Sequence, residues 1–167
     1  MDQLYKELKN FGKVKLKESL AKHTTFKIGG PAKYFVIVED VAKLSELLKY
    51  LDAQGIPYVV IGGGSNMRVS DDGFDGVIIR IKGGGVKVKS DVIEAGAGCT
   101  TVQVAQESIK AGLTGFEWGV GVPGTIGGAV RGNAGAMGGD MNKVIEKVEV
   151  YQDGEVVEYS NEESSFK

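Results

Sequence analysis

Residues 33–61 constrain the fold more than any other part of the chain. Residues 33–38 (KYFVIV) are aromatic and β-branched, which predicts a buried strand. Asp40 then stands at the N-cap position of a helix, and residues 58–61 (YVVI) predict a second strand. One face of that helix carries the apolar residues Val41, Leu44, Leu47, Leu48 and Leu51. The order predicts a right-handed βαβ unit with parallel strands.

Further elements follow from local patterns. A short amphipathic helix is expected over residues 2–11, and strands over residues 76–82, 85–89 and 91–98. Thr100 with Gln103 predicts the start of a helix that runs to about Ala111 and stops at Gly112. KVKLK near the N-terminus reads as a solvated strand edge.

The sequence of the C-terminal part predicts a hairpin followed by the start of a new helix. Residues 144–151 alternate apolar and polar, Asp153-Gly154 is a hairpin turn signal, and EVVEY supplies the return strand. Residues 160–163 (SNEE) form a capping box with only four residues behind it. We therefore expect a chain cut short, with a frayed polar tail as the alternative.

Composition limits the class of protein. Hydrophobic residues make up 42% and charged residues 25% of 167 residues, as in a folded globular domain. The net charge of −2 does not indicate the broad positive surface that binds nucleic acid or an anionic membrane. A single cysteine allows no intrachain disulfide and suits a reducing cytosol. No signal peptide, apolar span or metal-ligand spacing is present. We expect a cytoplasmic monomer without metal that binds neither membrane nor nucleic acid.

Glycine is the compositional deviation, with 26 residues in the chain. Residues 119–140 (GVGVPGTIGGAVRGNAGAMGGD) are the richest stretch, and ordered glycine is entropically costly. Pro123-Gly124-Thr125 resembles the start of a short helix whose N–H groups could face an anion. Either an extended ligand or a tight crossing of chain segments explains such a bare surface.

A second glycine cluster, IGGGSN at residues 61–66, directly follows the YVVI strand. Converging backbone N–H groups without Cβ atoms can hold phosphate oxygens, so a side chain at Gly64 is expected to fill the phosphate space. The cluster is neither GxxxxGK[ST] nor GxGxxG, and a plain tight turn is an equal alternative.

The other candidate residues give weaker evidence of a function. His23 reads as a surface or turn-bonding residue rather than a base, and Cys99 as a small buried residue rather than a nucleophile. Trp118 reads as a core or pocket-wall residue, and Asp71-Asp72 as a turn. The residues alone thus indicate a binding surface without a catalytic set.

HTTFKIGGPAKYF, GGGSN, GLTGFEWGVGVPGTIGGAV and NAGA, in this order, resemble the motifs of the UDP-N-acetylenolpyruvoylglucosamine reductases, in their second, shorter type. The resemblance covers residues 13–167. It implies an α+β fold of two subdomains, the FAD-binding PCMH type shared with vanillyl-alcohol-type oxidases. The implied parts are residues 1–20 as helix and lead-in, 21–82 as subdomain 1 and 83–167 as subdomain 2, with a C-terminal substrate-binding domain absent.

The resemblance also implies which residues hold FAD. Thr25, Ile28 and Gly29 would support the pocket, and the pyrophosphate would lie on the GGGSN loop. The implied cofactor-binding residues are Ile61, Gly62, Gly63, Gly64, Ser65, Asn66, Met67, Gly121, Val122, Pro123, Gly124, Thr125, Gly127, Gly128, Ala129, Asn133, Ala134 and Gly135.

The implied reaction belongs to peptidoglycan precursor synthesis. NADPH delivers a hydride to the flavin, which passes it to the enolpyruvyl double bond of a UDP-sugar. The family's catalytic arginine, serine and acidic residue would fall beyond Lys167, so no catalytic residue is expected on this chain and the fragment alone is expected to be inactive. Arg68 and Met137 depart from the family pattern.

Two alternatives stay open. The chain could be a non-catalytic nucleotide-binding module of the same fold, a reading that Arg68 beside the pyrophosphate loop favours. It could also belong to another FAD-dependent oxidoreductase of that fold, which the PGTIGGAV–NAGA pattern disfavours.

Overall fold

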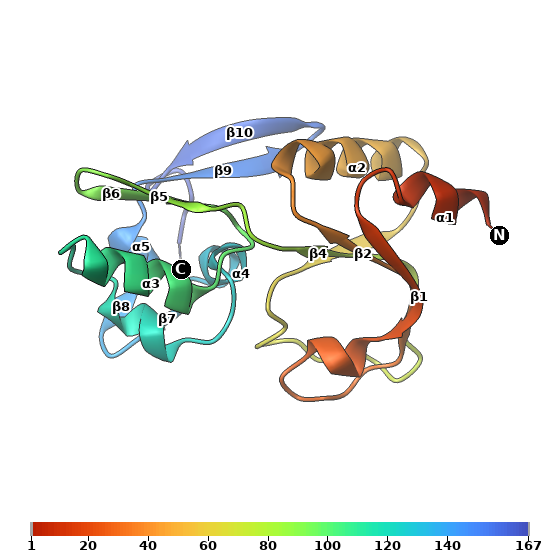
Figure 1. The fold of residues 1–167 in the computed structure, drawn as a ribbon, viewed down its shortest axis with the longest axis horizontal. Helices are drawn as coiled ribbons and strands as arrows, with labels where there is room; N and C mark the ends of the chain where they lie inside the picture. Colours follow the sequence, from red (N-terminus) through yellow and green to blue (C-terminus); the bar gives the residue numbers. More distant parts are fainter. Residues whose placement is uncertain (1, 167) are drawn as a thin grey trace. The chain divides into compact units, whose positions relative to one another are not determined.

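The structure, a computed structural model, describes residues 2–166 (Figure 1). The chain divides between Lys82 and Gly83 into two compact units, which are called unit 1 and unit 2 below. Each unit has its own sheet or hairpins, its own helices and its own buried residues, and each is described by itself.

Unit 1 is built on a four-stranded sheet with the strand order β1-β2-β4-β3. Its strands are β1 (Lys13–Ser19), β2 (Pro31–Val38), β3 (Tyr58–Ile61) and β4 (Phe74–Ile81). β1 lies at one edge of the sheet, as predicted, and is antiparallel to β2, whereas β4 is parallel to both β2 and β3. The strands of the predicted βαβ unit are therefore parallel, but β4, later in the chain, lies between them.

Helix α2 (Val41–Ala53) connects β2 to β3 and lies over one face of the sheet (Figure 1). The Asp40 carboxylate accepts a hydrogen bond from the Ala42 amide at 2.8 Å, so the predicted N-cap is confirmed. Leu47, Leu48 and Leu51 form its buried side, whereas Val41, predicted on the same apolar face, is exposed at the first turn. Helix α1 (Gln3–Leu8) is shorter than the predicted 2–11 and ends at Leu8, its one buried residue.

The two faces of the sheet bury different side chains, because successive residues of a strand point to opposite sides. Phe35 and its β4 partner Ile78 belong to a core cluster with Leu20, Ala32 and Ile61. Val36 and Ile79, the next pair along, are fully buried outside that cluster. Leu20 begins a short 3-10 helix, η1 (Leu20–His23), that follows β1.

Unit 2 contains three antiparallel two-stranded pairs and several short helices. In chain order it comprises β5 (Val86–Lys89), β6 (Val92–Ala95), α3 (Thr101–Lys110), η2 (Glu117–Gly121), α4 (Ile126–Arg131), β7 (Gly135–Ala136), β8 (Gly139–Asp140), α5 (Met141–Val144), β9 (Lys147–Gln152) and β10 (Glu155–Ser160). The predicted Thr100 cap is confirmed, since its hydroxyl accepts from the Gln103 amide at 3.1 Å.

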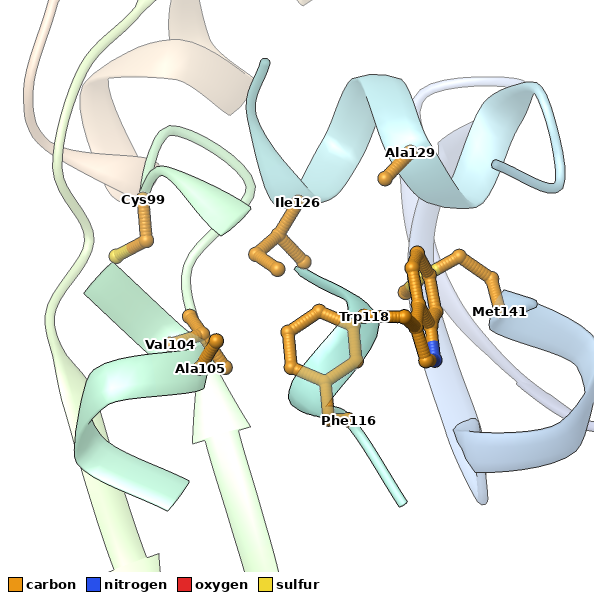
Figure 2. Close-up of a cluster of buried hydrophobic side chains, with 8 residues drawn as sticks. All are labelled: Cys99, Val104, Ala105, Phe116, Trp118, Ile126, Ala129 and Met141. Carbon is orange, nitrogen blue, oxygen red and sulfur yellow. The ribbon is translucent and has the colours of Figure 1, made fainter. Parts of the chain in front are cut away.

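The core of unit 2 gathers residues from elements far apart in the sequence (Figure 2). Phe116 and Trp118 lie in its middle and meet edge to face, with ring centroids 4.9 Å apart. The cluster is completed by Cys99, Val104, Ala105, Ile126, Ala129 and Met141. Trp118 is thus a core residue, and Cys99 is a small buried residue as predicted.

Two predictions in the C-terminal part need correction. The strand predicted from residue 144 begins only at Lys147 (β9), because Val144 is the last residue of helix α5, whose Asp140 cap accepts from the Lys143 amide at 3.1 Å. The predicted capping box exists, with the Ser160 amide and the Glu163 carboxylate 2.8 Å apart, yet turns rather than a helix follow it as far as residue 166.

No helix within residues 2–166 combines the length and the apolar character needed to cross a membrane.

The buried side of α2 gives a test of unit 1. Leu47 is fully buried, so Leu47→Ala leaves a cavity and should lower the free energy of unfolding by about 2–5 kcal/mol. Val41 lies on the same helix but is 57% exposed, and Val41→Ala should change it by less than about 0.5 kcal/mol. Urea unfolding followed by circular dichroism measures both, and equal effects would contradict the assigned face.

Candidate functional site

The GGGSN loop begins where β3 ends and is held by the segment that follows η1. The Thr25 amide donates to the Gly64 carbonyl at 3.1 Å. Gly64 is buried at φ +71°, and a Cβ on it would overlap the carbonyl oxygen of His23. Gly64 is therefore required by the protein's own backbone contact, a different reason from the phosphate space expected from the sequence. Gly64→Val would disrupt the loop itself.

The same loop carries polar groups that the described protein does not use. Within residues 2–166, the Ser65 hydroxyl and the Asn66 side chain have no hydrogen-bond partner. The amides of Gly63, Ser65 and Asn66 likewise donate no bond to another described residue. Exposed polar groups gathered on a glycine loop at the end of a strand suit an anion such as a phosphate.

Residues 28–30 lie against residues 69–73 of the same unit. The Gly30 amide donates to the Ser70 carbonyl at 2.8 Å, and a Cβ on Gly29 would lie 2.8 Å from the Val69 Cβ. The HTTFKIGG segment thus runs alongside the GGGSN loop and its continuation. Thr25 contacts this loop through its backbone amide, Gly29 lies close to Val69 in the continuation of the loop, and Ile28 is 44% exposed.

A pocket of about 260 Å³ opens beside the continuation of the loop. Ile61 and Met67, two of the implied cofactor residues, line it together with Arg68, and His23 lies at the same pocket. The remaining lining is formed by Leu20, Thr24, Val59, Val69, Ser70, Gly73, Phe74 and Ile78. The Arg68 guanidinium stands over the Phe26 ring, 5.7 Å from its centroid.

His23 is not the surface residue that its polar neighbours predict. Its side chain is only 10% exposed, stacks on Phe35, and bonds to Glu18 and Arg80. The Lys15 ammonium, and after it the His23 ring, donate to the Glu18 carboxylate and hold the pKa of Glu18 below its usual value. The sequence offered no signal for this group, because the contact between His23 and Arg80 spans 57 positions.

The amides at the start of helix α4, which the sequence suggested could face an anion, are not free to bind one. The first amides of α4 are already engaged: Ile126 donates to the Cys99 carbonyl and Gly127 to the Ala97 carbonyl, both at 2.9 Å. A Cβ on Gly127 would lie 2.9 Å from the Ala97 Cβ. The start of α4 is therefore a tight crossing of two chain segments, the alternative left open above.

Other residues of this stretch keep an open backbone surface. Apart from its chain neighbours, no described residue comes within 4 Å of a Cβ built on Gly121, and outside the backbone of its own helix a Cβ on Gly128 would meet the Thr125 hydroxyl at 3.4 Å. Gly121, Pro123 and Gly128 are exposed. This surface is free for a flat ligand.

The remaining implied cofactor residues of unit 2 face inward or are engaged. Thr125 is 7% exposed and caps α4, with its hydroxyl accepting from the Gly128 amide at 3.4 Å. Ala129 belongs to the core cluster and Ala134 packs against it. The Asn133 side-chain oxygen accepts from the Asn142 amide at 3.0 Å. These residues shape the stretch, and only their backbone is left for a ligand.

No group of three or more His, Cys, Asp or Glu residues in the described part of the chain is arranged to hold a metal ion.

Comparisons with known proteins agree with the fold. The model of the FAD binding domain family matches residues 32–160. The UDP-N-acetylenolpyruvoylglucosamine reductases of Halalkalibacterium halodurans and Bacillus subtilis are 42% and 37% identical over 171 residues, each match covering 99% of this chain but 57% and 56% of those proteins. The crystal structure of the reductase of Thermus caldophilus (MurB) matches with a TM-score of 0.77 at 37% identity, over 92% of this chain and 54% of that chain.

Two conclusions follow from these matches. The predicted α+β FAD-binding fold is confirmed. The chain spans little more than half the length of the relatives that it matches.

Gly121 gives a test of the open surface in unit 2. Because its surroundings are empty, Gly121→Val should change the free energy of unfolding by less than about 0.5 kcal/mol, yet its methyl groups should weaken FAD binding about tenfold or more. Gly132→Val is the matched control, since Gly132 is exposed, has only the Gly128 carbonyl oxygen at 3.5 Å from its Cβ position, and is not an implied contact. Flavin fluorescence titration would contradict the assignment if both variants bound FAD equally.

Glu18 gives a test of the charged group. Its lowered pKa stabilises the fold above the unfolded value of about 4.3, and this contribution is lost as the pH falls through the folded value. The stability difference between the wild type and Glu18→Gln should be largest at neutral pH and shrink as the medium becomes acidic. Urea unfolding at a series of pH values measures the difference; a difference independent of pH would contradict the paired carboxylate.

Proposed function

We propose that this chain, which belongs to the FAD binding domain family, is the flavin-binding part of an NADPH-dependent reductase. The proposed substrate is the enolpyruvyl ether of UDP-N-acetylglucosamine, reduced to UDP-N-acetylmuramate for peptidoglycan. The names of the similar proteins support the reaction, and it is proposed for a protein of their length.

The observation that carries the cofactor proposal is the set of unused polar groups on the GGGSN loop. Gly63 and Ser65 are half-buried and Asn66 is exposed, and their amides and the two side chains are unpaired within residues 2–166. They fit a diphosphate, which offers several acceptor oxygens at once. The residues present therefore fit FAD at this loop.

The chain's own groups would bind and orient the cofactor. Bound FAD would supply the chemistry of hydride transfer. In unit 1, the loop after β3 would hold a diphosphate. In unit 2, taken by itself, the open backbone at Gly121 and Gly128 would leave room for a flat ring system. Thr125 would act indirectly, by capping the helix on which Gly128 stands.

Small-molecule binding also suits the charge of the chain. A net charge of −2 offers no broad positive surface to nucleic acid, so we propose a small molecule as the ligand. The single, buried, unpaired cysteine supports a reducing compartment such as the cytoplasm. We further propose that the chain acts as a monomer.

A second candidate is a non-catalytic module that binds another nucleotide. Arg68 favours it, because its guanidinium lies over Phe26, forms no ion pair within residues 2–166, and remains able to meet an additional phosphate. In the first candidate Arg68 would meet the FAD diphosphate itself.

Ligand uptake separates the two candidates. The purified chain should carry FAD or take it up, with flavin absorbance and quenched flavin fluorescence. ADP should compete with FAD because it offers the same diphosphate, whereas riboflavin should compete less. Mass spectrometry of the released ligand identifies what the chain binds. A chain that neither carries nor binds FAD, and releases a different nucleotide, would overturn the first candidate in favour of the second.

A further inference from the structure

The only histidine of the chain is packed as an internal group of unit 1. His23 ends η1, its side chain is 10% exposed, and its ring stacks on Phe35 with centroids 4.1 Å apart and an interplanar angle of 24°. Nothing in the FAD proposal assigns this residue a role.

The partners of the imidazole determine its protonation state. Nδ1 lies 2.9 Å from an Arg80 guanidinium nitrogen, and Nε2 lies 3.0 Å from a Glu18 carboxylate oxygen. Arginine can only donate, so Nδ1 must accept, and Nε2–H donates to Glu18. His23 is therefore neutral, with its proton on Nε2.

The backbone of the same residue touches the proposed diphosphate loop. The His23 carbonyl packs so closely on Gly64 that no Cβ would fit there, and two residues on, the Thr25 amide donates to the Gly64 carbonyl at 3.1 Å. The Thr24 hydroxyl donates to the Ile28 carbonyl at 3.0 Å and fixes the turn formed by residues 24–28. The ring and the loop contact are thus parts of one short segment.

We propose that His23 is a positioning residue for the cofactor: its neutral ring, held between Glu18 and Arg80, keeps residues 23–25 against the GGGSN loop, and protonation of the ring weakens FAD binding. The proposal rests on the proposed function, because it takes FAD to bind at this loop. His23 acts through the backbone of Gly64 and touches no reacting atom.

The charged groups around the ring oppose one another. Glu18 on β1 would stabilise a protonated ring, although Lys15 shares the same carboxylate oxygen at 2.8 Å. Arg80 on β4 would then face a second N–H donor at 2.9 Å, which is repulsive. Lys22, on the same short helix, and Arg68, at the same pocket, add positive charge. Protonation should therefore break the contact with Arg80.

The first experiment reads the tautomer directly. Because the chain has one histidine, nitrogen-15 NMR of the imidazole gives a single pair of ring signals. We expect the Nε2–H form at neutral pH, and an NMR titration gives the pH midpoint of His23. A ring that carries its proton on Nδ1, or is charged at neutral pH, would overturn the proposal.

The second experiment measures the FAD dissociation constant on both sides of that midpoint. For the wild type it should rise about tenfold below the midpoint, as expected for loss of a hydrogen bond to a charged group. His23→Gln keeps a donor for Glu18 but cannot be protonated, so its affinity should be independent of pH. His23→Phe keeps the stacking alone and should bind about tenfold more weakly at every pH. Lys22→Gln removes a nearby exposed charge but keeps the ring, so its FAD affinity should still change about tenfold across its own His23 midpoint.

Each outcome decides a different point. A wild type that binds no FAD at any pH refutes the proposed function, and the present proposal falls with it. If the FAD dissociation constant of the wild type does not change across the His23 midpoint, the positioning role is refuted while FAD binding stands. The same conclusion follows if His23→Phe binds FAD as tightly as the wild type. Circular dichroism checks that the variants are folded; if either is not, the wild-type comparison of binding with the NMR midpoint still decides.

Discussion

The contact between the His23 carbonyl and Gly64 is the constraint on which unit 1 depends. It joins the segment after η1 to the loop after β3, and the Thr25–Gly64 hydrogen bond reinforces it. A parallel sheet presents the ends of its strands at one edge, and here the loop at that edge is shaped by a second backbone rather than by side chains. This leaves its remaining polar groups free, which suits a ligand rich in acceptor oxygens.

The glycines of the chain therefore serve two purposes that the sequence does not distinguish. Positions 64 and 127 require glycine because another part of the protein lies against them. A Cβ would meet the His23 carbonyl at Gly64 and the Ala97 Cβ at Gly127. At Gly121, by contrast, an added Cβ would meet no described residue beyond its chain neighbours. A glycine-rich stretch indicates close approach, and only the structure tells whether the approaching group is the chain itself.

The local elements could be predicted because their causes are local. The Asp40 cap, the buried side of α2 and the Asp153-Gly154 turn each depend on residues within a few positions, and all are present. The position of β4 between β2 and β3, and the bonds from Glu18 and Arg80 to His23, depend on pairings across tens of residues. The predicted start of β9 at residue 144 is wrong, because the alternation over residues 144–151 begins inside the helix that Asp140 caps. The site residues carried over by resemblance remain predictions.

The central place of β4 bears on how the chain is made. A ribosome releases β2, α2, β3 and the GGGSN loop before β4, yet no sheet hydrogen bonds join β2 directly to β3, because β4 lies between them. Until Ile81 has emerged, the strand that carries the loop has no neighbour in the sheet, and Arg80, the partner of His23, is also missing. The GGGSN loop thus belongs to the last step of unit 1 assembly, and a nascent chain stalled before that strand would expose unpaired, apolar strand edges to chaperones.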